Sequence, residues 1–146
     1  MVCTFFGHGD CYDVDKNKLR YAIEELILNG VDIFYVGNQG YFDRVVFECL
    51  LQLKEIYQHL CVEVILAYLP TTKSVYDPYL EYGVYPEGIE LGPPRFAIER
   101  RNKWMLNHAD FCLCYVNHTW GGAYKFARQA IRKGLFVINL GTEELK

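Results

Sequence analysis

Five compact apolar runs divide the chain, and each is rich in β-branched or aromatic residues. They span residues 2–6, 31–36, 62–68, 111–116 and 135–140. Continuous apolar runs, unlike runs that alternate with polar residues, are typical of strands that are covered on both faces. The pattern therefore predicts a parallel sheet buried between two layers.

Segments with helical periodicity lie between these runs. A first helix is expected between an N-cap at Asp15 or Asn17 and the stop signal Asn29–Gly30. Further helices are expected over residues 41–59, 94–108 and about 121–133. Because strands and helices alternate, we predict a single α/β domain over residues 1–146, with a Rossmann-like, doubly wound, mainly parallel five-stranded sheet and helices on both faces.

One interval breaks the alternation. Residues 71–93 show neither period, and all five prolines lie in or beside them. Four tyrosines also recur there: Tyr76, Tyr79, Tyr82 and Tyr85. Connections this long inside a domain tend to be lids or binding loops. We expect a flap that either packs on the surface or covers a ligand.

Composition and charge narrow the class of protein. The net charge is −3 and no block of Lys or Arg stands out, so neither nucleic acid nor a membrane is expected as a partner. No apolar stretch could span a bilayer, and the first apolar run ends at Gly7, too early for a signal peptide. Because the six cysteines also lack framework spacing, we expect a cytoplasmic protein with reduced thiols. No cofactor is expected, and no metal either, because Cys112 and Cys114 alternate along a predicted strand rather than forming turn-like zinc ligands.

Small and polar residues follow three of the predicted strands, where open parallel sheets bind ligands. The candidates for ligand binding are Gly7, His8 and Asp10 in the first turn, Gly37, Asn38 and Gly40 in the second, and Trp120, Gly121 and Gly122 before the last helix. The Gly121–Gly122 pair is the best anion site, since glycines admit an anion to the free N–H groups that open a helix. Neither a Walker motif nor a complete dinucleotide fingerprint is present, which disfavours ATP hydrolysis and ordinary NAD binding.

The stretch from Arg101 to Asp110, the strand after it and the Gly121–Gly122 pair resemble the SLOG superfamily. That superfamily includes the LOG-type nucleoside-monophosphate phosphoribohydrolases and the Rossmann domain of DNA-processing protein A. The turn at residues 37–40, with Asp43 after it, is also similar to small bacterial and phage members. The resemblance implies a nucleotide or nucleotide-derived ligand at the strand ends, and homodimers or higher homo-oligomers.

Individual positions can be carried over from this resemblance. Arg101 and Met105 match the arginine and methionine of the LOG motif, in which the arginine binds the ligand and takes part in catalysis. Gly121 and Gly122 match the first glycines of the loop Pro-Gly-Gly-x-Gly-Thr-x-x-Glu. The proline, third glycine, threonine and catalytic glutamate of that loop are replaced here by Trp120, Tyr124, Lys125 and Arg128. These departures favour ligand binding over hydrolysis.

Three functions follow as hypotheses. The favoured one is a module that senses or sequesters a nucleotide-derived molecule. Arg101 and the Gly121–Gly122 amides would bind its phosphate. The turns at 7–10 and 37–40 would bind the sugar hydroxyls, and Trp120 or a flap tyrosine would cover the base. The alternative is a LOG-like or deoxyribosyltransferase-like enzyme acting at an N-glycosidic bond, with a carboxylate from Asp10, Asp43 or Glu99. The third is an interaction protein without a pocket.

Structural interpretations compete with these roles for single residues. Arg101 could belong to a surface ion-pair cluster with its neighbours Glu99 and Arg100. His8 could face solvent, and Asp10 could cap a turn.

Overall fold

The structure is a computed structural model that describes residues 1–69 and 81–145. A six-stranded, all-parallel sheet forms its centre, in the order β4-β3-β2-β1-β5-β6. The strands are β1 (Val2–Gly7), β2 (Ile33–Val36), β3 (Cys61–Ile65), β4 (Gly83–Val84), β5 (Phe111–Tyr115) and β6 (Phe136–Asn139). The predicted Rossmann-like, doubly wound α/β fold is confirmed, whereas the predicted number of five strands is wrong.

The additional strand is β4, which lies inside the interval expected to form only a flap. Gly83 and Val84 pair with Val64 and Ile65 of β3. A strand of two residues is too short to show a period of two, so its pairing depends on the edge that β3 offers. Residues of the predicted flap are therefore partly built into the sheet.

The predicted flap tyrosines divide into two groups. Tyr76 and Tyr79 lie outside the described residues. Tyr82 and Tyr85 pack against the main apolar core, and the ring of Tyr82 meets Phe47 edge-on at 5.7 Å between ring centroids. The two described tyrosines therefore contribute to packing under α2.

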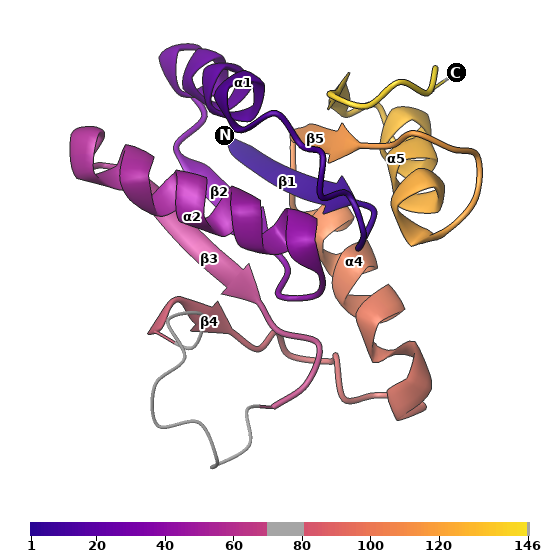
Figure 1. Ribbon diagram of the computed structural model, residues 1–146. Helices are drawn as coiled ribbons and strands as arrows, with labels where there is room; N and C mark the ends of the chain where they lie inside the picture. The colour runs from indigo at the N-terminus through magenta and orange to yellow at the C-terminus, as the bar shows by residue number, and fades with distance from the viewer. Residues whose placement is uncertain (70–80, 146) are drawn as a thin grey trace.

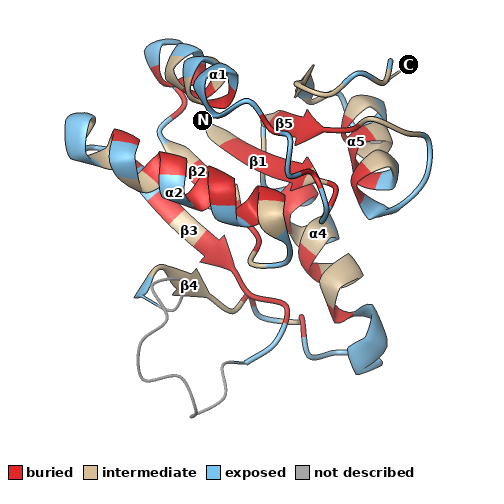
Figure 2. Ribbon diagram, in the orientation of Figure 1, coloured by how far each residue is buried: buried red, intermediate tan, exposed pale blue. Residues whose placement is uncertain are grey.

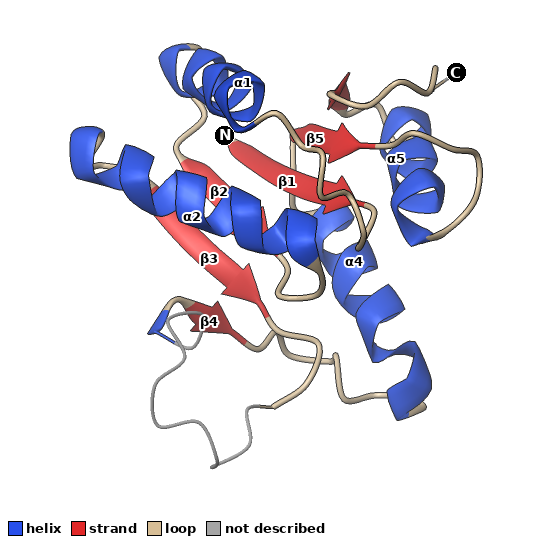
Figure 3. Cartoon of the chain, viewed as in Figure 1, coloured by secondary structure: helices blue, strands red, loops and turns tan. Residues whose placement is uncertain are grey.

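Helices cover both faces of the sheet (Figures 1 and 3). On one face lie α1 (Lys16–Leu28) and α2 (Tyr41–Ile56), and on the other α4 (Ala97–Asn107) and α5 (Gly122–Arg132). Asp15, not Asn17, caps α1, since its carboxylate accepts the N–H groups of Asn17 and Lys18. The helix expected from Pro94 begins with a 3-10 turn, η1 (Pro94–Phe96), before α4.

The sheet separates two apolar layers. Figure 2 shows that the central strands, which lie between the helices, are mainly buried. Neighbouring residues of β1 point to opposite faces, as in any strand. Phe5 packs with Phe34 in the layer under α1 and α2, whereas Phe6 stacks on Phe126 of α5 at 5.5 Å between centroids. Burial on both faces explains why the strands read as continuous apolar runs.

The strand order reverses at β1. From β1 the chain adds β2, β3 and β4 on one side and then crosses back to place β5 and β6 on the other. Gly7, the last residue of β1, pairs with Tyr115, the last residue of β5. The carboxyl ends of these two strands form the topological switch point, which is where open α/β sheets bind ligands.

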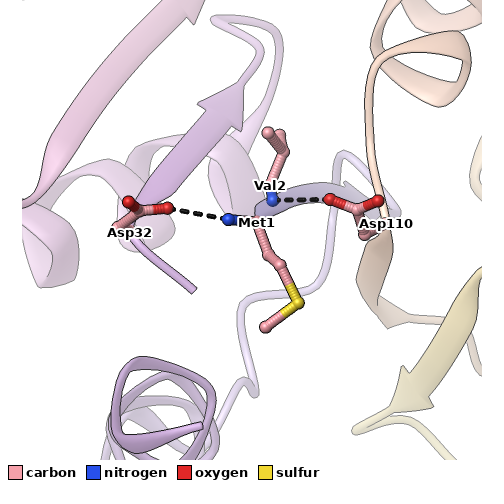
Figure 4. Close-up of polar contacts among 4 residues, drawn as sticks. All are labelled: Met1, Val2, Asp32 and Asp110. Atoms are coloured by element: carbon pink, nitrogen blue, oxygen red, sulfur yellow. Dashed lines mark hydrogen bonds and ion pairs between the residues drawn. The ribbon is translucent and has the colours of Figure 1, made fainter. Parts of the chain in front are cut away.

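Two carboxylates from distant segments hold the start of β1 (Figure 4). The Met1 ammonium lies 2.9 Å from Asp32 Oδ1, and the Val2 N–H donates to Asp110 Oδ2 at 2.9 Å. The Asp110 N–H in turn donates to the Val2 carbonyl at 2.9 Å. The reciprocal pair extends the β1–β5 ladder by one step, so Asp110 fixes the register of the two strands that meet at the switch point.

The cysteines are free thiols, and all but Cys61 are buried. Burial raises the pKa of the thiol of Cys49 to about 11, so this group is protonated at neutral pH.

Among the helices of residues 1–69 and 81–145, none has both the length and the apolar character needed to cross a membrane.

Gly7 is required by packing, which gives a direct test of the fold. A Cβ at Gly7 would lie 2.2 Å from the ring of Phe42, whereas a Cβ at Gly9 would meet nothing within 4 Å. We expect Gly7→Ala to lower the free energy of unfolding by about 1–3 kcal/mol through overpacking. Gly9→Ala is the matched control and should change stability by less than about 0.5 kcal/mol. Urea denaturation of both variants measures the difference, and equal losses would contradict the packing.

Candidate functional site

A cavity of about 390 Å³ lies at the carboxyl end of β1. Its walls come from the turn after β1, from α4 and from the start of α5, with Gln39 from the connection between β2 and α2 and Asp43 from the first turn of α2. The volume lies within the range of roughly 300–1,000 Å³ that is usual for small-molecule sites. The cavity thus coincides with the switch point of the sheet.

Seven of the ten predicted ligand-binding residues line this cavity. They are Gly7, His8, Asp10, Arg101, Trp120, Gly121 and Gly122. Gly37, Asn38 and Gly40 are not among the lining residues. Gly40 instead packs on the turn after β1, where the Tyr41 N–H donates to the Gly9 carbonyl at 3.2 Å. In the second turn, Gln39 lines the cavity, whereas Gly40 contacts the turn after β1.

Arg101 is the buried cation of the cavity, with only 2% of its surface exposed. Its Nε donates to Asn102 Oδ1 at 2.8 Å, and its Nη1 donates to the Ile65 carbonyl at 3.1 Å. A guanidinium has five N–H groups, and the other three have no hydrogen-bond partner among the described residues. These three donors are therefore open to a ligand.

The structural interpretation of Arg101 as part of a surface ion-pair cluster is wrong. Glu99, its expected partner, contacts Lys103 at 3.9 Å and forms a close ion pair with Lys125 of α5. Arg100 also turns away and donates through Nε to the Ile89 carbonyl at 2.7 Å. Glu99 and Arg101 lie two positions apart, which places them on different sides of α4.

Asp43 is the buried carboxylate of the cavity. Its Oδ2 accepts the N–H of Gln39 at 2.9 Å, one turn before it at the start of α2. Burial raises the pKa of Asp43 to about 6, against the opposing effects of the Arg101 charge and the Gln39 hydrogen bond. The side chain is therefore a carboxyl group that titrates close to neutral pH.

Gly37 brings Asp43 and Arg101 together. A Cβ at Gly37 would lie 2.7 Å from Asp43 Oδ2 and 2.8 Å from Arg101 Nη1, so both side chains rest against its bare α-carbon. No N···O contact within 4.0 Å joins the two charges in the described part of the chain. The carboxylate and guanidinium are thus neighbours that do not neutralise each other by direct contact.

Three aromatic rings form a stack on the cavity wall. His8 stacks on His118 at 3.6 Å, and His118 stacks on Trp120 at 3.8 Å, with 18° between the planes in both pairs. Trp120 ends the stack and is 67% exposed. A further planar group could therefore extend the stack on the open side of the indole.

His8 is buried, so the interpretation that it faces solvent is wrong. Its Nε2 accepts the N–H of Asn117 at 3.2 Å, which fixes the tautomer with the proton on Nδ1. Burial and the neighbouring His118 lower the pKa of His8, while Asp10 opposes them. The ring is therefore held neutral at neutral pH, and protonating Nε2 would remove the acceptor for Asn117.

The start of α5 forms the side of the cavity opposite the β2–α2 connection. Gly121 precedes the helix at φ +90°, a conformation that favours glycine, and no side chain caps the first turn. A Cβ at Gly122 would meet nothing within 4 Å. The first N–H groups of α5 are therefore accessible, and both they and the helix dipole favour an anion.

Three residues with polar side chains line the cavity but are not among the predicted ligand-binding residues: Gln39, Asn102 and His118. His118 lies in the turn after β5, so the signal that identified His8 would also have identified it. Its Nδ1 is buried and has no hydrogen-bond partner among the described residues. Asn102 gives no signal in the sequence, because it lies within α4 and not in a turn after a strand.

No protein-family model matches the chain, and no curated protein matches it.

In residues 1–69 and 81–145, no three His, Cys, Asp or Glu side chains are placed to hold a metal ion. The groups that the cavity offers are one guanidinium, the two carboxyl groups of Asp10 and Asp43, the N-terminus of a helix and a ring stack.

Asp43 should destabilise the fold when it is ionised. Its pKa is raised from 3.8 to about 6, so its contribution to stability is complete below 3.8 and is lost as the pH rises through 6. We expect Asp43→Asn to be more stable than wild type at pH 8, by up to about 3 kcal/mol at ~1.4 kcal/mol per pKa unit, and the difference to shrink towards pH 4.

Urea denaturation at pH 8, 6 and 4 measures this effect. Glu48→Gln, which neutralises an exposed carboxylate on the same helix, is the control and should change stability little at any of the three pH values. A variant no more stable than wild type at pH 8 would show that burial does not disfavour the ionised Asp43.

Proposed function

We propose that the protein binds a nucleotide or nucleotide-derived small molecule at the carboxyl ends of its strands, as a sensing or sequestering module. The observation that carries this proposal is the buried Arg101, which lines the same cavity as the uncapped start of α5 and has three N–H groups without a partner among the described residues. A buried guanidinium without a contacting counter-charge is costly, and a phosphate would supply both the charge and bidentate acceptors.

Each part of a nucleotide has a matching surface in the cavity. Arg101 and the backbone amides at Gly121 and Gly122 would hold the phosphate. The turn from Gly7 to Asp10 would face the sugar, and Trp120 would cover the base, since stacking of a base on an aromatic ring contributes about 1–3 kcal/mol. A covering role for Tyr82 and Tyr85 has no support, because both pack against the core.

The size of the cavity favours a compact ligand. Its volume of about 390 Å³ is near the lower end of the range for small-molecule sites, which suits a mononucleotide better than a dinucleotide. Membership of the SLOG superfamily is part of this proposal, and it favours binding without turnover because Arg128 stands where the LOG loop has its catalytic glutamate. Cytoplasmic localisation and homo-oligomerisation stay predictions.

Asp43 favours a second candidate function, cleavage or transfer at an N-glycosidic bond. A carboxyl group with a pKa of about 6 can carry a proton near neutral pH, as a general acid that protonates a leaving base requires. Asp10 also lines the cavity, whereas Glu99 is engaged by Lys103 and Lys125. Asp43 is thus the carboxyl group best placed for such chemistry.

Replacing Arg101 tests the phosphate site. We expect Arg101→Ala to weaken binding of the nucleoside 5′-monophosphates AMP, GMP, CMP and UMP at least tenfold, since hydrogen bonds to charged groups contribute about 1.5–3 kcal/mol. The bare nucleosides, which lack the anion, should lose less than threefold. Isothermal titration calorimetry measures both, and equal losses for nucleotide and nucleoside would refute the assignment.

Two further variants control for folding. Arg95→Ala removes an exposed arginine outside the cavity and should bind as wild type does. Arg101→Lys keeps the charge but cannot reproduce the fork of a guanidinium, so it should bind with intermediate affinity. Thermal denaturation of each variant separates lost binding from lost structure.

Turnover is tested by the fate of the ligand. We expect each nucleotide that stabilises the protein against heat to be recovered intact by chromatography after overnight incubation. Release of free base by wild type, and its absence with Asp43→Asn, would establish the N-glycosidic enzyme instead. If no nucleotide raises the melting temperature, the interaction-protein hypothesis gains support.

A further inference from the structure

We propose, resting on the proposed nucleotide binding, that Asp43 determines which sugar the cavity accepts, by taking a hydrogen bond from a hydroxyl of the ligand's pentose. The phosphate is held on the α5 side of the cavity, and the sugar hydroxyl lies between the Asp43 carboxylate and the Arg101 guanidinium. A ribonucleotide is then preferred over the deoxynucleotide that lacks this hydroxyl.

The first step concerns what Asp43 already binds. A carboxylate has two oxygens with about four acceptor positions. The described residues fill one of them, through the Gln39 N–H on Oδ2. Asp43 is 8% exposed, lines the cavity, and has no ion pair within 4.0 Å in the described part of the chain. The carboxylate therefore presents free acceptor positions to whatever enters the cavity.

The second step concerns what kind of group fits there. Asp43 Oδ2 and Arg101 Nη1 lie 2.7 Å and 2.8 Å from the position that a Cβ on Gly37 would occupy, and both residues line the cavity, so an acceptor and a donor are close neighbours at its wall. A hydroxyl both donates and accepts, and it can therefore donate to the carboxylate while accepting from the guanidinium. An anionic group would be repelled by Asp43, and an ammonium group would be repelled by Arg101.

The third step concerns the sugar. Neighbouring hydroxyls on a pentose provide two such groups at short range, which matches the several open acceptor positions on Asp43 and the one N–H of Arg101 that a bidentate phosphate would leave open. Removing the hydroxyl leaves the buried carboxylate without its donor, and a site built to bond a hydroxyl rejects the analogue that lacks it. Specificity for the sugar thus follows from the burial of Asp43.

Calorimetry at pH 8, where Asp43 is ionised, tests the proposal. The probes are AMP, GMP, CMP and UMP, each compared with its 2′-deoxy and 3′-deoxy form. We expect wild type to bind at least one ribonucleotide ten or more times tighter than a deoxy form, a ratio set by one hydrogen bond to a charged group. Asp43→Asn should bring this ratio below three, mainly by weakening the ribonucleotide. Glu48→Gln should leave the ratio as in wild type.

The outcomes separate this proposal from the proposed function. Equal affinity of wild type for ribo and both deoxy forms would overturn the role of Asp43 while leaving nucleotide binding intact, and this measurement needs no variant to fold. A ratio unchanged in Asp43→Asn would overturn it too. Failure of every nucleotide to bind would overturn the proposed function and the sugar role together. A purely structural role of Asp43 would weaken ribo and deoxy forms equally.

Discussion

The burial of the Arg101 guanidinium is the constraint on which the carboxyl edge of the sheet depends. Burying a charge is costly unless hydrogen bonds and opposite charge compensate. Asn102 supplies an oxygen from α4, and the Ile65 carbonyl supplies another from the end of β3. Asp43 adds a negative charge from α2. One side chain thus joins three elements, and the floor of the cavity is complete only when all three are packed.

Glycines at this edge serve two different purposes, although they look alike in the sequence. At two of them, neighbouring side chains occupy the space where a Cβ would point. Phe42 occupies it at Gly7, and Asp43 and Arg101 occupy it at Gly37. Gly9 and Gly122 have open space where a Cβ would point. The first kind allows close packing, and only the second kind leaves backbone accessible to a ligand.

The sequence predicts the fold well because burial on both faces leaves a strong pattern. Continuous apolar runs such as residues 111–116 mark strands with helices on each side, and the alternation of elements implies the parallel order. The strand β4 escapes prediction because two residues carry no period and depend on the edge of β3. The 3-10 turn before α4 escapes as well, since Pro94 is equally suited to open either kind of helix.

The candidate site is predictable only in part, and the reason is physical. The turns after parallel strands meet at one edge of the sheet, so the proximity of His8 and Gly121 can be predicted from the sequence. What each side chain contacts within that edge depends on packing between layers. The proximity of Asp43 to Arg101 requires the bare α-carbon of Gly37, which no local pattern reveals.

Polar groups that cost stability gather in this one cavity. Asp43 and Arg101 are buried without contacting each other, and the Nδ1 of His118 is buried without a partner among the described residues. By contrast, the buried Thr4, which lies outside the cavity lining, donates to the Tyr35 carbonyl at 3.2 Å. Proteins depart from satisfied packing mainly where function requires it. Because the residues that carry two opposite charges, Asp43 and Arg101, line the same cavity, a ligand with both donors and acceptors would satisfy both at once, which neither an apolar molecule nor a simple anion could do.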